Sequence, residues 1–333
     1  MPHQPRVVVA NHSCWDVYAR NESWLAQQPA EIVSEAHFHQ MPAQEFEQVL
    51  QGAHGAVGPW REITLQQMQK CDTLQVISLA CSGYESVNLN DATRTGIVVT
   101  NAPVVELSEA VADHTIGLML ATARKIPQHH FQICHGNHSR GLHTTIWQRT
   151  LGIVGLGAIG RAVARRAVGF GMPLLATEPY PDESFLAEYS IELVDLDTLL
   201  ERSDFVSLHV RLTPATEFMI GRRELQLMKS SAILVNTARQ DLIDERALSA
   251  ALTEREIAGA GLDDPPHDSN SPLLQREDVV LTPHLGNRTY VACDAMLRRG
   301  VTNALAVFRG QRPDNVLNPE VYDAELRAVR PVE

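Results

Sequence analysis

Short β-branched runs alternate with longer stretches of helical periodicity along the chain, and this alternation constrains the fold more than any other feature. Such a pattern is typical of parallel β-sheets whose two faces are covered by helices. It occurs as two series, so we expect an α/β protein with two doubly wound sheets of the Rossmann or flavodoxin-like type. The expected strands are residues 7–9, 31–33, 55–57, 74–78 and 97–99 in the first series, and residues 151–154, 173–177, 205–208, 233–235, 257–262 and 279–281 in the second.

Two longer helical patterns, residues 107–125 and 290–308, lie between the two series and predict the crossings between two domains. A chain of 333 residues has room for two domains. We expect a discontinuous substrate-binding domain, residues 1–103 plus about 290–333, with a nucleotide-binding domain of about residues 104–289 inserted into it. A cleft separating the two parallel-sheet domains would be the natural ligand site.

The composition disfavours several classes of protein. Hydrophobic residues make up 44% and charged residues 20%, which disfavours disorder, collagen and coiled coil. The formal net charge of −12 repels phosphate backbones and anionic lipid, so we expect neither nucleic acid nor a membrane as a partner. The apolar runs are too short for a signal peptide or a membrane span.

The cysteines indicate a reducing, cytoplasmic environment. They are odd in number and scattered, without a CxxC pair, so neither a disulfide framework nor a four-cysteine zinc site is expected. They are Cys14, Cys71, Cys81, Cys134 and Cys293.

Residues 129–143 hold five of the fourteen histidines beside Cys134. A metal site at Cys134 and His138 would lack a carboxylate or a second cysteine, and the spacing follows no zinc pattern. We therefore expect no metal here, and an exposed or subunit-contacting loop instead.

The glycine-rich stretch Gly155-Leu156-Gly157-Ala158-Ile159-Gly160 follows an expected strand and opens the helical run 161–170. Gly155 allows a tight turn, Gly157 lets the backbone approach a pyrophosphate, and Gly160 lets helix and strand pack closely. The helix start offers unpaired N–H groups to phosphates. The stretch, including Ala158 and Ile159, is therefore predicted to bind a dinucleotide.

A carboxylate follows the next expected strand. Glu178 lies 18 residues beyond Gly160, where it can accept hydrogen bonds from the adenine ribose hydroxyls. The next residues, 179–182, supply no Arg or Lys for a 2′-phosphate, and Glu178 would repel one. The sequence therefore favours NAD over NADP.

Three later strands of the second series end in polar residues. Arg239 comes shortly after one, Asp263 and Asp264 after the next, and His284 after the last. Because ligands bind beyond the carboxyl ends of parallel strands, these groups should converge on the reactive end of the cofactor. The set suits hydride transfer to a 2-keto acid. The Arg239 guanidinium would clamp the carboxylate and polarise the carbonyl, and His284 would give a proton to the forming alkoxide.

Together, these features resemble the D-isomer-specific 2-hydroxyacid dehydrogenase family, which includes D-lactate, D-glycerate and phosphoglycerate dehydrogenases. The resemblance is dense over residues 74–307, whereas residues 1–70 share only the general pattern. Besides the glycine-rich stretch, it rests on VTNAP (99–103), VADH (111–114), SLHVRLT (207–213), LVNTAR (234–239), AGAGLD (258–263) and LTPH (281–284).

The resemblance implies that Arg239 binds the substrate, that His284 is the general acid and base, and that Asp263 meets the nicotinamide carboxamide. It also implies that backbone N–H groups around Ser82 and Gly83 bind the substrate carboxylate. In the family, the region equivalent to residues 128–147 reaches across to a second subunit, so we expect a homodimer. The remaining residues expected around the cofactor are His209, Val210, Thr213, Thr237, Ala238 and Gly286.

The chain departs from the family at four places. Cys81 and Gln240 replace the usual glycines, and Arg211 replaces the usual proline. The fourth departure is a shortened loop after Asp263, where the family has the glutamate that pairs with the histidine.

Two alignments of this loop are open. Equal spacing from Asp263 makes Asp268 the partner of His284, whereas a gap after Asp264 leaves either Asp264 or no residue in that role. We favour Asp268 because it keeps the usual spacing.

The leading prediction is an NAD-dependent dehydrogenase that interconverts a small 2-keto acid and a D-2-hydroxy acid. The length leaves no room for an added regulatory domain, which favours simple substrates such as glyoxylate, hydroxypyruvate or pyruvate. The alternative is an NAD-sensing binding protein on the same fold with weak activity, which the irregular loop supports and the presence of Arg239 and His284 opposes. A formate-dehydrogenase-like reaction is disfavoured, because that subgroup pairs its histidine with a glutamine and no Gln occurs between Asp263 and Ser271.

Overall fold

A computed structural model describes residues 4–11, 15–36, 41–58, 61–264, 266 and 268–323. Backbone contacts divide the chain into two compact units. Unit 1 comprises the chain up to Leu107 and again from Thr289, and unit 2 comprises Ser108–Arg288. These limits lie close to the expected ones at residues 103 and 290.

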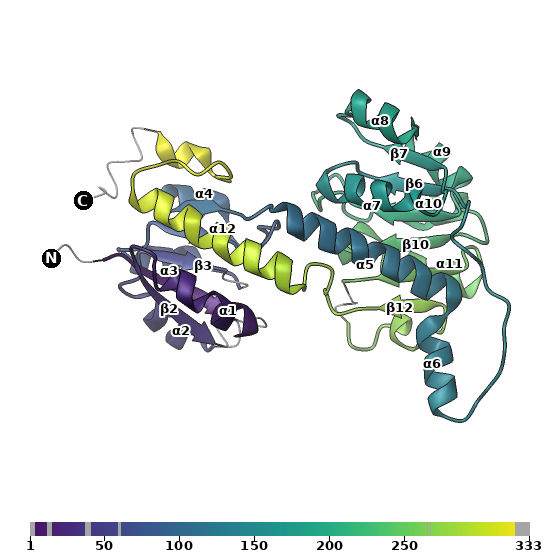
Figure 1. The fold of residues 1–333 in the computed structure, drawn as a ribbon, viewed down its shortest axis with the longest axis horizontal. Coiled ribbons are helices and arrows are strands. Elements are labelled where there is room, and N and C mark those ends of the chain that lie inside the picture. Colours follow the sequence, from purple (N-terminus) through teal and green to yellow (C-terminus); the bar gives the residue numbers. More distant parts are fainter. Residues whose placement is uncertain are drawn as a thin grey trace. The chain divides into compact units, whose positions relative to one another are not determined.

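Unit 1 contains a five-stranded parallel sheet with the order β2-β1-β3-β4-β5, which is the flavodoxin-like order. Figure 1 draws its strands as arrows and its helices as coiled ribbons. All five expected strands are present. Four of them bury nearly all of their apolar residues, whereas Ile32 and Val33 of the edge strand are half-buried. The strands are β1 (Arg6–Asn11), β2 (Glu31–Ala36), β3 (Gly55–Val57), β4 (Val76–Ser78) and β5 (Val98–Thr100). The helices are α1 (Trp15–Leu25), α2 (Ala43–Leu50), α3 (Leu65–Lys70), α4 (Leu89–Arg94), α12 (Tyr290–Phe308) and the 3-10 helix η3 (Pro319–Tyr322).

The C-terminal segment from Thr289 belongs to unit 1. Helix α12 packs against β3 and β4 so closely that a Cβ on Gly300 would lie 2.8 Å from Val57 Cγ1. Beyond the helix, the buried Asn318 side chain accepts a hydrogen bond from the Val99 N–H (2.8 Å) and donates one to the Ile97 carbonyl (2.9 Å). The tail is therefore bound along β5.

Unit 2 contains a seven-stranded parallel sheet with the order β12-β11-β10-β9-β6-β7-β8, a Rossmann arrangement with one additional strand. Its strands are β6 (Leu151–Val154), β7 (Leu174–Thr177), β8 (Ile191–Leu193), β9 (Phe205–Leu208), β10 (Ile233–Asn236), β11 (Gly259–Leu262) and β12 (Val279–Leu281). Its helices are α5 (Val105–Arg124, which begins in unit 1), α6 (Ile126–Cys134), α7 (Ala158–Val168), α8 (Glu183–Tyr189), α9 (Leu196–Arg202), α10 (Arg222–Leu227), α11 (Glu245–Thr253), η1 (Gln240–Leu242) and η2 (Pro272–Gln275).

Successive residues of these strands face opposite sides of the sheet, and both sides are covered. Ile233 and Val235 of β10 belong to the apolar core shared with α5, α7 and α8, whereas Leu234 belongs to the core shared with α9, α10 and α11. Because both faces are buried, the central strands are mostly apolar. Their polar residues therefore gather beyond the strand ends, where a ligand can reach them.

The sequence did not predict two elements of unit 2. Strand β8 is short and lies at the sheet edge, and only Ile191 of its three residues is buried, so its apolar signal is weak. Helix α6 occupies the first part of the expected exposed loop. It starts after Lys125, whose φ of 49° breaks the path of α5, and it holds Pro127 in its first turn, where no N–H is needed.

Two further expectations concern the described part of the chain. None of its helices combines the length and apolar character needed to cross a membrane. Cys71, Cys81, Cys134 and Cys293 form no disulfide, and Cys14 lies outside the described residues.

Candidate active site

The glycine-rich turn between β6 and α7 has the geometry that its sequence predicts. Gly155 has a φ of +94°, and a Cβ there would lie 2.9 Å from the His209 carbonyl oxygen. A Cβ on Gly160 would lie 2.1 Å from the Gly155 carbonyl oxygen. Both positions therefore require glycine for the turn itself to form.

Gly157 is different, because a Cβ there would meet no atom of the described residues within 4 Å. Gly157 and Ala158 are exposed and Ile159 is half-buried at the start of α7, which has no side-chain cap. The first N–H groups of a helix lack partners within the helix and attract anions. Open space beside such donors fits the pyrophosphate of NAD.

Glu178 lies at the end of β7, directly beside this turn. Its Oε2 accepts a hydrogen bond from the Leu156 N–H (2.8 Å), and its Oε1 accepts one from the Tyr180 N–H (3.1 Å). Each carboxylate oxygen keeps a further lone pair, so the group can still accept hydrogen bonds from ribose hydroxyls. This position supports the expected role of Glu178.

A basic residue also lies beside the turn, but it comes from α7 and not from the segment after Glu178. Arg161 donates to the Leu156 carbonyl (2.9 Å) and pairs with Asp182 (2.8 Å). Hydrogen bonds from Ser184, the Phe185 N–H and Arg161 lower the pKa of Asp182 to about 2. The charge of Arg161 is thus matched by a carboxylate.

The segment after β9 packs against the glycine-rich turn. The His209 carbonyl and the Val210 side chain are the groups that a Cβ on Gly155 would strike. The His209 ring lies 2.8 Å from the Ser207 hydroxyl, and burial lowers the pKa of His209 to about 3, so the ring is neutral. Thr213 lies farther along, bonded to the Thr216 hydroxyl.

A tight turn after β10 presents Arg239. Asn236, almost fully buried, donates to the Arg239 carbonyl (2.6 Å) and accepts from the Ala238 N–H (2.9 Å). The hydroxyl of Thr237 lies 2.9 Å from that of Thr115 on α5. These contacts fix the backbone on both sides of Ala238 and set the direction in which Arg239 leaves the sheet.

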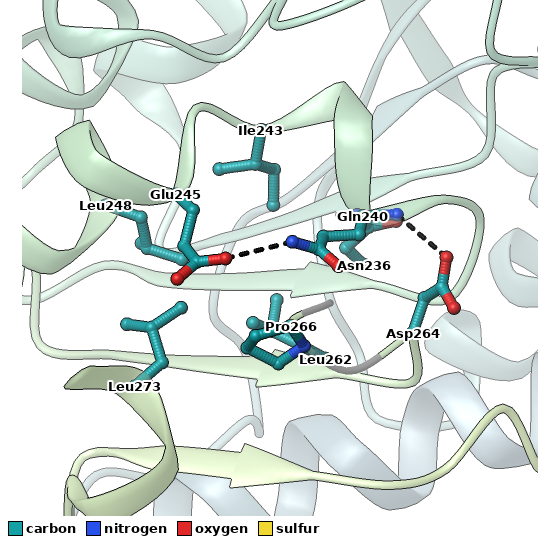
Figure 2. A pocket seen from close by; sticks show the side chains of 9 residues that line it. All are labelled: Asn236, Gln240, Ile243, Glu245, Leu248, Leu262, Asp264, Pro266 and Leu273. Atoms are coloured by element: carbon teal, nitrogen blue, oxygen red, sulfur yellow. Dashed lines mark hydrogen bonds between the residues drawn. The ribbon is translucent and has the colours of Figure 1, made fainter. Parts of the chain in front are cut away.

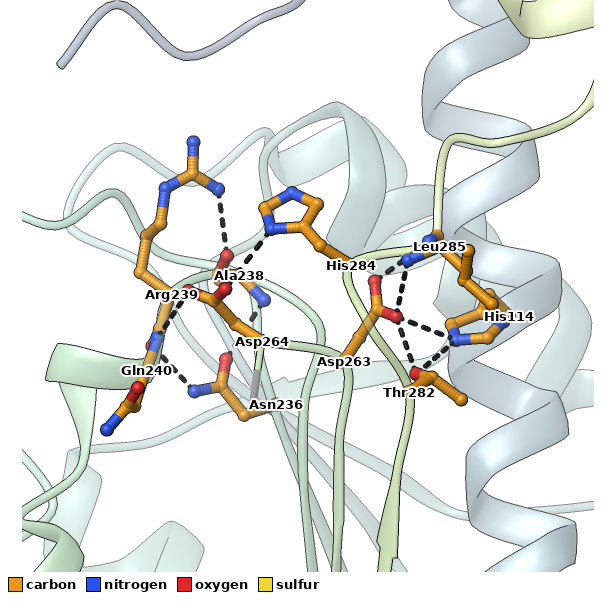
Figure 3. A network of polar contacts seen from close by, with 11 residues as sticks. His114, Asn236, Ala238, Arg239, Gln240, Asp263, Asp264, Thr282, His284 and Leu285 are labelled. Atoms are coloured by element: carbon orange, nitrogen blue, oxygen red, sulfur yellow. Dashed lines mark hydrogen bonds and ion pairs between the residues drawn. The ribbon is translucent and has the colours of Figure 1, made fainter. Parts of the chain in front are cut away.

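Asp263, at the end of β11, is the centre of a buried polar network (Figure 3). Its carboxylate accepts hydrogen bonds from the Thr282 hydroxyl (2.6 Å) and the Leu285 N–H (2.8 Å). The Gly286 N–H (2.8 Å) and His114 Nε2 (3.0 Å) complete the set. Burial alone would raise the pKa of Asp263, but these donors lower it below its ordinary value.

His284 follows β12 in an unusual backbone conformation. Its φ is 56°, and its N–H donates to the Asp263 carbonyl (2.6 Å). A left-handed conformation is uncommon for a residue with a side chain, and it persists where surrounding contacts impose it. The half-exposed ring points Nδ1 at Asp264 Oδ1, 3.2 Å away.

The structure corrects the expected partner of His284, which is Asp264 and not Asp268. Asp264 follows Asp263 directly at the strand end, so it lies next to the histidine without any loop to span. Burial alone would raise the pKa of Asp264, but hydrogen bonds from His284 and the Gln240 N–H, with the charge of Arg239, lower it. Asp268 is exposed, and its carboxylate accepts from the Asn270 N–H (2.8 Å).

The Arg239 guanidinium and the His284 ring extend toward the same side of this network (Figure 3). The structure therefore brings together Arg239, Asp264 and His284, as strand-end placement predicts for the first and third. Ser82 and Gly83 lie in unit 1, in the loop after β4. The Ser82 carbonyl accepts from Asn101 (2.8 Å), and their role toward a substrate stays a prediction.

Sequence reasoning did not single out the residues that support these groups. They are His114, Thr115, Asn236 and Thr282, whose contacts with Asp263, Thr237 and Arg239 are described above. Three of the four lie inside the motifs that carry the resemblance, so motif membership was the available signal.

The glycine-rich turn gives a paired prediction. Gly160→Ala should destabilise the fold by about 1–3 kcal/mol or more, because its Cβ collides with backbone. Gly157→Ala should leave the melting temperature nearly unchanged and weaken NADH binding at least about tenfold, which is about 1.4 kcal/mol, because its Cβ enters the space of the pyrophosphate. Thermal denaturation and NADH fluorescence titration measure the two effects. Normal NADH affinity in Gly157→Ala would show that the cofactor does not use this space.

Comparison with known proteins identifies the family. Residues 116–286 match the model of the D-isomer specific 2-hydroxyacid dehydrogenase NAD binding domain. The chain is 41% identical over 268 residues to a glyoxylate reductase of Korarchaeum cryptofilum, covering 78% of this chain and 80% of that protein. It is 36% identical over 278 residues to the glyoxylate/hydroxypyruvate reductase B of Pectobacterium carotovorum, covering 81% and 87%.

A solved structure agrees with these relatives. The NAD-complexed D-isomer specific 2-hydroxyacid dehydrogenase of Lactobacillus delbrueckii ssp. bulgaricus superposes with a TM-score of 0.77 at 28% identity, covering 94% of this chain and all of that one. The family match includes the glycine-rich turn, Arg239 and His284. The chain therefore belongs to the D-isomer-specific 2-hydroxyacid dehydrogenases, NAD-dependent enzymes that interconvert 2-keto acids and 2-hydroxy acids.

Proposed function

We propose that this enzyme uses NADH to reduce a small 2-keto acid, of the class of glyoxylate, hydroxypyruvate and pyruvate, to the D-2-hydroxy acid. The observation that carries the proposal is the group formed by Arg239, Asp264 and His284 beyond the carboxyl ends of the sheet that also holds the glycine-rich turn. The names of the two relatives support the substrate class. A cytoplasmic location, expected from the scattered cysteines, is part of the proposal.

The residues divide the chemistry between them. NADH supplies the hydride. The Arg239 guanidinium binds the substrate carboxylate and polarises the carbonyl. Because His284 Nδ1 faces Asp264, Nε2 is the nitrogen that gives its proton to the forming alkoxide. The Asp264 carboxylate favours the protonated ring that this step needs.

The substrate class is tested by following NADH absorbance with a panel of 2-keto acids. We expect turnover with the small acids and a loss of kcat/KM as the side chain grows. NADH should be preferred over NADPH by at least about tenfold in kcat/KM, equivalent to about 1.4 kcal/mol, because Glu178 repels a 2′-phosphate. The absence of turnover with every acid would favour the NAD-sensing binding protein instead, and equal use of the two coenzymes would contradict the role of Glu178.

Arg239 and His284 should act at different points of the reaction. Arg239→Ala should raise KM and lower kcat, because the clamp both binds and polarises the substrate. His284→Ala should chiefly lower kcat, by roughly 10²- to 10⁴-fold, as expected for the loss of a general acid. NADH binding, measured by fluorescence, should survive both changes and is the control for folding. Near-normal kcat in His284→Ala would refute its role.

The pH profile of kcat/KM for reduction distinguishes the two candidate acidic partners. Reduction needs the protonated imidazole, so activity falls as pH rises. Removing a carboxylate that stabilises this form moves the alkaline limb to lower pH. Asp264→Asn should therefore shift the limb to lower pH, while the matched variant Asp268→Asn should leave it in place. A shift in Asp268→Asn alone would restore the original expectation.

We also propose that the enzyme is a homodimer that uses α6 and the segment following it. Large apolar side chains are exposed along this part of the chain, which is unusual for a surface that meets only water. They include Phe131, Ile133, Leu142 and Trp147. Cys134 faces His130 across 3.8 Å, and His129 faces His143 across 2.6 Å, so the histidines pair with neighbours on the same segment.

Light scattering at micromolar concentration should give twice the chain mass of 36.8 kDa. Replacing Leu142 and Trp147 together by Ser should lower the dimer fraction, while Tyr180→Ser, which removes an exposed aromatic ring elsewhere in unit 2, should not. A monomer mass for the unmodified protein would disprove the proposal.

A further inference from the structure

A small pocket lies beside Asp264, among η1, α11 and η2 (Figure 2). Apolar side chains line part of it, including Leu248, Leu262 and Leu273. Its polar lining residues include Gln240 of η1 and Glu245 of α11, besides Asn236 and Asp264. Polar groups beside apolar side chains need hydrogen-bond partners. The partners of Gln240 and Glu245 show which parts of the chain these two residues connect.

A chain of hydrogen bonds runs through the pocket. The Gln240 N–H donates to Asp264 Oδ2 (3.0 Å), and the Gln240 side-chain amide donates to Glu245 Oε2 (2.9 Å; Figure 2). The Ser271 hydroxyl donates to Glu245 Oε1 (2.5 Å). Both ends of the segment from Asp264 to Ser271 are thus bound to the Gln240–Glu245 pair. This segment is the shortened loop of the sequence analysis.

The two oxygens of the Asp264 carboxylate have different hydrogen-bond partners. Oδ1 faces His284 Nδ1 and Oδ2 accepts from the Gln240 backbone, so the position of that N–H decides where the carboxylate can lie. The Gln240 backbone is in turn restrained by its own side chain, through Glu245. A glycine at this position would keep the N–H but lose the restraint and gain backbone freedom.

The contact of the Gln240 side chain with Glu245 leaves one polar atom of the amide without a partner in the described part of the chain. This atom, Oε1, is buried. A leucine would fill the same space without leaving an acceptor unpaired. The amide therefore contributes its donor group, which is the part that reaches Glu245.

We propose that Gln240 is a positioning residue that holds Asp264 against His284, with Glu245 as its anchor. Two of the departures from the family, the glutamine after Arg239 and the shortened loop, then belong together. This inference rests on the proposed role of Asp264.

The test compares Gln240→Leu and Gln240→Gly with the unmodified protein and with Asp264→Asn. The readout is the midpoint at which the His284 ring titrates, followed by NMR on histidine-labelled full-length protein and assigned with His284→Gln. We expect Gln240→Leu to move this midpoint to lower pH, in the same direction as Asp264→Asn. Gln240→Gly should act in the same way. The alkaline limb of kcat/KM should follow.

Two further variants separate positioning from folding. Glu245→Gln keeps an acceptor for the Gln240 amide and should retain most of the unmodified midpoint, whereas Glu245→Leu should behave like Gln240→Leu. Gln226→Leu is the matched control, because it removes another amide-to-carboxylate contact of unit 2, Gln226 to Glu256 (3.4 Å), which shares no residue with the Asp264–Gln240–Glu245 chain. It should leave the midpoint unchanged.

The outcomes distinguish this inference from the proposed function. A lowered midpoint in Asp264→Asn with an unchanged one in Gln240→Leu would overturn the positioning role and leave Asp264 as the partner. No change in either would overturn both. Because the ring titration needs no substrate, a wrong substrate class would leave this test valid.

Discussion

The rest of the candidate active site depends on the hydrogen bonds that the buried carboxylate of Asp263 accepts. This carboxylate gathers donors from three parts of unit 2: His114 of α5, Thr282 after β12, and the N–H groups of Leu285 and Gly286. A buried carboxylate that lost these donors would carry a large desolvation penalty. The network therefore specifies one path for the chain on both sides of His284.

That path explains the geometry of the proposed catalytic pair, His284 and Asp264. The His284 N–H is bound to the Asp263 carbonyl, and the residue is held at a positive φ. Asp264 is the next residue after Asp263, so the same anchor places both the carboxylate and the imidazole that it faces. Gly286 can lie beside them because it has no Cβ. A Cβ at this position would lie 2.9 Å from Asp263 Oδ2. The hydrogen bonds of Asp263 and the close packing of Gly286 therefore determine the positions of His284 and Asp264.

The sequence predicted those parts of the fold that buried apolar runs determine. All strands with several buried residues were found, and both long helices, α5 and α12, lie at the expected places. Strand β8 was missed because an edge strand with one buried residue has almost no periodic signal. Helix α6 was missed because none of its residues is buried, so its apolar residues Phe131 and Ile133 mark no buried face.

In the candidate site too, the sequence predicted some residues and not others. Gly155, Arg239 and His284 were predictable because strand ends and backbone sterics fix their roles locally. The acidic partner was not, because it depends on where a shortened loop closes up, and spacing alone pointed to Asp268. The contacts of Gln240 with Asp264 and Glu245 join residues 24 and 5 positions apart, respectively, and only a folded chain shows them.

The central claim is that Arg239, Asp264 and His284 form one catalytic group. A crystal structure of the enzyme with NADH and oxamate, an unreactive analogue of a 2-keto acid, tests it most directly. We expect the Arg239 guanidinium on the oxamate carboxylate, His284 Nε2 within about 2.6–3.2 Å of the neighbouring oxygen, and Asp264 on Nδ1. Oxamate bound without Arg239 and His284, or Asp264 turned away from the ring in the complex, would contradict the account.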